Sequence, residues 1–177
     1  VLAHRLDRPV SGVVIFGKKI SVLKMLMQQF KERRLQKTYL AITNNAPPQK
    51  SDNLIHWHIK DAINRQARMY DEAKPDGKSA EWNDRLLAES KGRYLLKVEL
   101  ITGRYHQIRA QLAHIVCPVV GDITYGSKTL YKENAICLHS YNLQLLHPVT
   151  GEMLSITAPP PVDEQWNLFE QHIQELK

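Results

Sequence analysis

One stretch of the chain decides much of the fold: residues 94–118 read YLLKVELITGRYHQIRAQLAHIVCP. Up to Ile101 the side chains alternate between two faces, with Tyr94, Leu96, Val98 and Leu100 on one and Leu95, Lys97, Glu99 and Ile101 on the other. This alternation predicts a β-strand that ends at Thr102-Gly103. Ile108, Leu112 and Ile115 then recur at helical spacing before Pro118, so we expect a strand, a tight turn and a helix.

Working outward from this unit, residues 35–42 also alternate, which places Lys37 and Tyr39 on the same face of a second strand. A helix is expected at 21–34, with Ser21 as its N-cap and a basic last turn. Its methionines are expected to fill the core, because apolar residues there follow amphipathic spacing. The run of Val13 to Phe16 predicts a buried strand that anchors the segment before it.

The rest of the chain adds strands and one more helix. Residues 44–92 are polar and interrupted by prolines, so hairpins and loops around short strands such as 55–59 are expected. A strand is expected at 138–146 and a last helix at 164–176. Strands with few regularly placed crossover helices indicate an α+β fold, with a mixed, mainly antiparallel sheet and flanking helices. We expect residues 1–177 to form one domain.

Composition and charge narrow the classes of function. The net charge is +6, and residues 1–40 alone carry nine Lys or Arg against two acids, a net +7. Such a concentration attracts polyanions, among which nucleic acid is the commonest. No apolar run approaches the roughly 20 residues of a membrane span, and Cys117 and Cys137 have no metal-binding spacing. None of the eight histidines forms a recognisable ligand pair, so we expect no metal. We also expect a cytoplasmic monomer without a membrane span.

Two segments are denser in acids, bases and glycines than folding requires. The first is residues 4–12, HRLDRPVSG, which on its own is more typical of a surface loop with an Asp–Arg salt bridge. The second runs from Thr102 to Arg109, where free amides and Arg104 at a strand-to-helix junction would suit a phosphate. His106 and Arg109 are three residues apart, so a helix would bring them to one side.

Together these segments resemble the RluA family of pseudouridine synthases over nearly the whole chain. His4-Arg5-Leu6-Asp7 with Ser11-Gly12 is similar to the first family motif, residues 37–41 (KTYLA) to the second and residues 102–109 (TGRYHQIR) to the third. Further matches follow in the same order at Pro118, Gly121-Asp122, Tyr125-Gly126, Leu138-His139 and His147-Pro148.

The resemblance implies the isomerisation of uridine to pseudouridine in RNA without a cofactor. It implies that Asp7 is the catalytic carboxylate, that Arg109 forms its salt bridge and keeps it anionic, and that Tyr39 stacks on the flipped uracil. The resemblance also implies that the Tyr39 hydroxyl takes part in the final proton removal. RNA contacts are expected from five further basic residues: Arg5, Arg8, Lys37, Arg104 and His106. Asp122 follows a glycine at a turn, and we expect it to accept backbone hydrogen bonds.

Several alternatives remain open at this point. The RNA is expected to be ribosomal large-subunit RNA, with transfer RNA as the alternative. A catalytically silent RNA-binding module of the same fold is possible, whereas a glycosidase would need a second catalytic acid that is not evident. The chain begins close to its first motif, so we expect that an N-terminal part of the catalytic domain, and in some relatives an S4-like domain, precedes it.

Overall fold

A computed structural model describes residues 2–176 of the chain. Its elements, in order, are β1 (Ser11–Gly12), α1 (Ile20–Glu32), β2 (Gln36–Thr43), β3 (Ser51–Asp61), β4 (Gln66–Tyr70), β5 (Lys78–Ser90), β6 (Arg93–Leu100), α2 (Gln107–His114), a 3₁₀ turn (Ile123–Tyr125), β7 (Leu138–Leu146), β8 (Met153–Thr157), α3 (Glu164–Asn167) and α4 (Glu170–Gln174).

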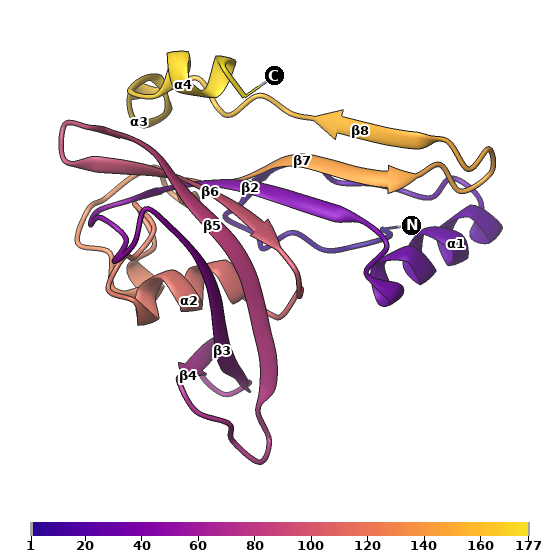
Figure 1. Ribbon diagram of the computed structural model, residues 1–177, viewed down its shortest axis with the longest axis horizontal. Helices are drawn as coiled ribbons and strands as arrows, with labels where there is room; N and C mark the ends of the chain where they lie inside the picture. The colour runs from indigo at the N-terminus through magenta and orange to yellow at the C-terminus, as the bar shows by residue number, and fades with distance from the viewer. Residues whose placement is uncertain (1, 177) are drawn as a thin grey trace.

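The strands form one sheet in the order β1-β7-β2-β6-β5-β3-β4, with β8 also paired to β7. Only the short β1–β7 pairing is parallel among the described strands. Helix α2 lies on one side of the sheet and α3 and α4 lie on the other (Figure 1). The expected α+β class, with a mixed and mainly antiparallel sheet, is confirmed.

The main core fills both sides of the central strands. Ile108 and Leu112 of α2 and Trp166 and Phe169 near the C-terminus belong to this one buried cluster, together with residues of β2 and β6. The expected strand over residues 94–101 and the helix before Pro118 are both present as β6 and α2. The strand at 138–146 is confirmed with those bounds, whereas β8 was not anticipated.

The prediction of a strand from Val13 to Phe16 is wrong, because these residues form no strand. Extended pairing with β7 stops at Gly12, and only an isolated bridge joins Phe16 to Leu2. The residues after Gly12 cannot continue along β7, because the same edge of β7 beyond Ser140 is already paired with β8 and with Ala158, the residue that follows β8. The segment still anchors the preceding loop, since the amide of Val13 donates to the carbonyl of Ser140 at 2.9 Å.

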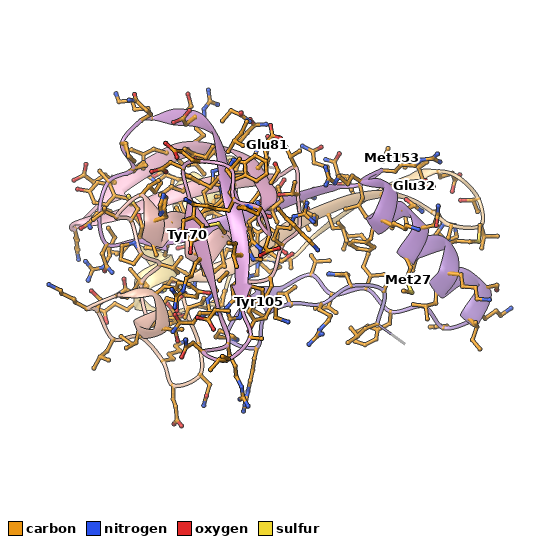
Figure 2. The ribbon with its side chains drawn as sticks, turned by 90° about the horizontal axis from the view of Figure 1, so that it is seen from below. Met27, Glu32, Tyr70, Glu81, Tyr105 and Met153 are labelled. Carbon is orange, nitrogen blue, oxygen red and sulfur yellow. The ribbon has the colours of Figure 1, made fainter. Side chains whose placement is uncertain are left out.

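Helix α1 differs from expectation in its start and in its burial. It begins at Ile20 with Lys19 at the N-cap position and no side-chain cap, so Ser21 lies in the first turn. Only Leu26 is buried in this helix, and Met27 is 52% exposed rather than part of the core. Figure 2 shows why Met27 is exposed. The helix that carries Met27 and Glu32 extends away from the body of the molecule and lies beside the turn near Met153.

Two other expectations hold only in part. The hairpins expected between residues 44 and 92 are present, but their strands are long, with 11 residues in β3 and 13 in β5. The polar residues lie on solvent-facing sides of these strands and not in loops. The C-terminal helix is divided into α3 and α4 at Leu168 and Phe169. This break lets Trp166, Phe169 and Ile173 all pack into the core. No helix among residues 2–176 is long and apolar enough to span a membrane.

Candidate active site

The loop that carries Asp7 is held on both sides by hydrogen bonds. The His4 ring stacks on Phe30 of α1 at 4.8 Å between centroids, and its Nε2 accepts a hydrogen bond from the Ile15 amide at 3.2 Å. The Asp7 carbonyl accepts from the Val10 amide at 2.9 Å, which closes a turn. His4 therefore has a structural reason to be in this motif, which the sequence alone did not provide.

A close approach of two backbones ties the same loop to β7. Gly12 has a φ of +117°, and a Cβ at that position would lie 2.2 Å from the Ser140 carbonyl oxygen. Glycine alone tolerates both conditions. Next to it, the Ser11 hydroxyl hydrogen-bonds to Nδ1 of the buried His139 at 2.8 Å. The Ser-Gly pair of the first motif thus docks the loop onto the sheet.

A cavity of about 700 Å³ lies over this loop, and it brings together every site residue expected from the sequence. All eight line it: Arg5, Asp7, Arg8, Lys37, Tyr39, Arg104, His106 and Arg109. Seven Lys or Arg side chains line the cavity, whereas Asp7 is the single carboxylate among its described lining residues. The cavity is therefore suited to an anionic molecule, with one acid placed inside a cationic wall.

Asp7 is partly buried, with 27% of its side chain exposed, beside two residues of the third motif. Its Oδ2 lies 3.7 Å from Nη1 of Arg109 and 3.9 Å from Nε2 of His106. Burial raises the pKa of Asp7 above its ordinary value of 3.8, and the attraction of Arg109 opposes this rise without cancelling it. The expected ion pair is present, but desolvation has the larger influence on the pKa.

Arg109 lowers the pKa of Asp7 only partly because it is bound more tightly to a different carboxylate, that of Asp122. Its Nε and Nη2 donate to the two oxygens of Asp122 at 2.7 and 2.9 Å, and both side chains are almost fully buried. The Asp122 side chain therefore acts through a guanidinium, whereas its backbone carbonyl accepts hydrogen bonds from the Tyr125 and Ser127 amides at 3.1 and 3.0 Å, as expected at a turn. Such a two-point ion pair fixes the orientation of Arg109, which leaves Nη1 directed towards Asp7.

His106 belongs to the same network in an uncharged form. Its Nε2 lies 3.1 Å from Nη1 of Arg109 and accepts that hydrogen, so Nδ1–H donates to the Tyr125 hydroxyl oxygen at 2.9 Å. Burial and the charge of Arg109 lower the pKa of His106 to about 4. Tyr105 stacks on the ring at 3.8 Å. The sequence indicated no role for Tyr125, which the fold brings here from 16 residues beyond Arg109.

Tyr39 and Lys37 project into the cavity from alternate positions of β2, as the spacing predicts. Burial raises the pKa of Tyr39, so its hydroxyl stays protonated at neutral pH. The Lys37 ammonium lies close to Gly103, where a Cβ would be only 2.7 Å from its Nζ. Burial and the nearby Arg33 lower the pKa of Lys37.

The turn that carries Arg104 is less open to a phosphate than expected. The Arg104 amide donates to Oε1 of Gln107 at 2.9 Å, and the Arg104 Nε donates to the Ser79 carbonyl at 2.9 Å. The expectation of free backbone amides at this junction is therefore wrong for Arg104, because the first side chain of α2 caps it. Arg5 and Arg8, by contrast, are exposed at the rim.

Comparison with known proteins identifies the class to which this fold and site belong. The family model described as RNA pseudouridylate synthase matches residues 1–114. The chain belongs to this family, as the resemblance of its motifs implied. An uncharacterised RNA pseudouridine synthase of Chloroflexus aurantiacus is 36% identical over 167 residues, which are 93% of this chain and 51% of the relative.

Relatives with named substrates include proteins of two kinds. Ribosomal large subunit pseudouridine synthase C of Buchnera aphidicola is 32% identical over 89% of this chain and 52% of its own length. tRNA pseudouridine synthase C of Haemophilus influenzae is 31% identical over 92% of this chain and 74% of its own length. The chain spans about half the length of most of these relatives.

The fold has solved counterparts. Human RNA pseudouridylate synthase domain containing 4 superposes with a TM-score of 0.75 at 20% identity, covering 98% of this chain and 74% of that one. Human RNA pseudouridylate synthase domain containing 1 gives the same TM-score at 21% identity. At such identity the likeness establishes the mixed sheet and its connections.

Proposed function

We propose that this protein isomerises uridine to pseudouridine in RNA, with Asp7 as the catalytic carboxylate. The observation that carries the proposal is the position of Asp7, which is the single acid among seven cations around a cavity of about 700 Å³. The cations suit the phosphates of RNA, and the acid suits an attack on the ribose or base. Membership of the pseudouridylate synthase family supports the same reaction.

The reaction exchanges one bond for another and needs no cofactor. Asp7 acts on the target uridine so that the bond between ribose and the uracil nitrogen breaks, the uracil rotates, and a bond to a uracil carbon forms. The proton displaced from that carbon must leave and one must return to nitrogen, so no atom is gained or lost. Asp7 performs this role as a carboxylate, and its raised pKa places the acid limb of activity above the pH at which an ordinary Asp ionises.

Tyr39 is suited to hold the base once it has left the stack. The residue forms part of the cavity wall, and base–aromatic stacking is worth about 1–3 kcal/mol. Its raised pKa disfavours a phenolate, so a part for Tyr39 in proton removal would use the neutral hydroxyl. Arg109 and His106 position Asp7, since both lie within 4 Å of its Oδ2 and both are fixed by further hydrogen bonds.

The basic wall would hold the RNA while the target base is extruded. Exposed Arg5 lies two residues from Asp7 and can occupy the space that the base leaves or bind a phosphate. Arg8, Lys37 and Arg104 extend the cationic surface around the cavity. Binding through such residues depends on salt, because each neutralised phosphate releases counterions.

Ribosomal large-subunit RNA is the proposed substrate, and transfer RNA is the alternative. Relatives named for both substrates match with similar identity, 32% for the ribosomal enzyme and 31% for the tRNA enzyme. We propose a cytoplasmic monomer, since ribosomal and transfer RNA both act in the cytoplasm. Mapping pseudouridines in cellular RNA with and without the full-length gene would distinguish the substrates, because the lost site lies in one RNA or the other.

The reaction itself is tested by Asp7→Asn, which removes the charge and keeps the size. Pseudouridine formation should be abolished while RNA binding is retained. Asp76→Asn is a matched control, because Asp76 is an exposed acid outside the cavity. Full activity in Asp7→Asn would refute the assignment, and wild-type protein that binds RNA without modifying it would favour a silent binding module.

A further inference from the structure

A second group of chemically active side chains lies away from the cavity. His56 of β3, Asp71 just after β4 and His114 at the end of α2 have their ligand atoms within 4.8 Å of one another. Nε2 of His114 is 2.7 Å from Oδ1 of Asp71, and Nε2 of His56 is 3.8 Å from the same oxygen. None of these residues lines the active-site cavity. Two imidazole nitrogens therefore converge on one carboxylate oxygen.

The fold explains why residues so distant in the sequence meet. β3 and β4 are antiparallel, and Trp57 pairs with Tyr70, so continuing the register places His56 opposite Asp71. Helix α2 packs against β4 and ends at His114, which brings its last side chain to the same point. Three separate elements thus contribute one group each. A bound ion here would join the helix to the edge of the sheet.

His56 has the features of a preorganised ligand. It is 6% exposed, so the side chains packed around it hold its imidazole in place. Its ring packs against that of His114 at 4.8 Å in an edge-on arrangement. Its other nitrogen, Nδ1, is contacted by Nε2 of the fully buried Gln111 at 2.9 Å.

Gln111, which contacts His56 from helix α2, has a buried amide oxygen, Oε1, with no hydrogen-bond partner among the described residues. If the amide turns over, Oε1 accepts Nδ1–H of His56 and leaves Nε2 of the imidazole free as a ligand. The turn replaces the 3.3 Å contact from Gln111 Nε2 to the Ala80 carbonyl, so the side chain must also shift away from that oxygen. Metal-bound histidines characteristically donate their other N–H to such an acceptor.

We propose that His56, Asp71 and His114 bind one divalent transition-metal ion of the Zn²⁺ type, with water as the remaining ligand. Two nitrogens and one carboxylate oxygen are a donor set for such ions and not for Ca²⁺ or Mg²⁺, which prefer oxygen alone. Ligands at about 2.0–2.1 Å from a tetrahedral Zn²⁺ lie roughly 3.4 Å apart. The observed 2.7 and 3.8 Å bracket that spacing.

The adjustment required falls on the side chains that can move. The Asp71 side chain is 80% exposed and that of His114 is 29% exposed, whereas His56 is only 8% exposed. Asp71 can therefore swing away from His114 to admit the ion while His56 stays in place. The carboxylate bonds directly to His114 at 2.7 Å, and a bound ion would replace that contact.

The inference is tested by titrating the full chain with Zn²⁺ in a calorimeter. One ion should bind per chain and raise the melting temperature. His114→Gln and Asp71→Asn, both at accessible positions, should each weaken binding at least tenfold and remove most of that rise. His172→Gln is the matched control, because His172 is an exposed histidine at the far end of the chain.

Co²⁺ serves as a spectroscopic probe of the ligands. It should give visible bands of a nitrogen- and oxygen-ligated site without the intense charge-transfer band of a thiolate, which separates this site from Cys117 and Cys137. Failure of the wild type to take up one ion at micromolar zinc would overturn the proposal. So would equal uptake by His114→Gln, Asp71→Asn and the wild type, or a thiolate spectrum.

Discussion

Replacing Arg109 by methionine tests the electrostatic centre of the site. The change keeps an unbranched side chain but removes the guanidinium that donates to both oxygens of Asp122 at 2.7 and 2.9 Å. Asp122 is 1% exposed, so its charge would remain without a partner in a region that water hardly reaches. Breaking a buried ion pair in this way costs about 3–5 kcal/mol. That is a large share of the roughly 5–15 kcal/mol by which a typical domain is stable.

The assay is urea unfolding followed by circular dichroism, with two comparison variants. Arg34→Met should lower the free energy of unfolding by no more than about 1 kcal/mol, because Arg34 forms an exposed ion pair with Glu32. The double variant Arg109→Met, Asp122→Leu should lose about 0.5–3 kcal/mol less than the sum of its single changes, since no charge is left unpaired.

The same substitution has a consequence for catalysis. Loss of the Arg109 charge removes the main influence that lowers the pKa of Asp7, so the acid limb of residual activity should move to higher pH. If Arg109→Met unfolds like Arg34→Met, or if the double variant shows simple additivity, the buried pair is not the organising feature that the geometry indicates.

Three further changes test other parts of the site. The pKa of Asp7 is raised in the folded chain, so ionisation of Asp7 destabilises the fold once the pH rises through that pKa. Asp7→Asn should therefore increase the melting temperature at neutral pH. A decrease would contradict the desolvated carboxylate. The pKa of His106 is lowered from 6.5 to about 4, so wild-type stability should fall between pH 6.5 and 4 as the unfolded chain takes up a proton, and His106→Gln should lessen this loss in urea titrations at pH 7 and 5. Lys37→Gln should weaken RNA binding and reduce the salt slope by about 1, as measured by filter binding, whereas Lys50→Gln outside the cavity should leave both unchanged.

Local sequence patterns predicted the elements whose side chains have a strict period. Alternation identified β2 and β6, and the spacing of Ile108 and Leu112 identified α2. The pattern failed where tertiary competition decides the outcome. Val13 to Phe16 has strand composition, but β8 occupies the edge of β7 that it would need. Met27 has core spacing, but α1 has too little of the molecule around it to bury that face.

The sequence by itself identified the family and eight of the residues that line the cavity, because three ordered motifs carry them. Which charges are paired was a different matter, since ion pairs depend on distances that no spacing specifies. Only the tertiary structure showed that Arg109 binds Asp122 more closely than Asp7, and that His106 hydrogen-bonds to Tyr125. The same holds for His56, Asp71 and His114, which lie on three elements and acquire a common neighbourhood only when the sheet and α2 pack together.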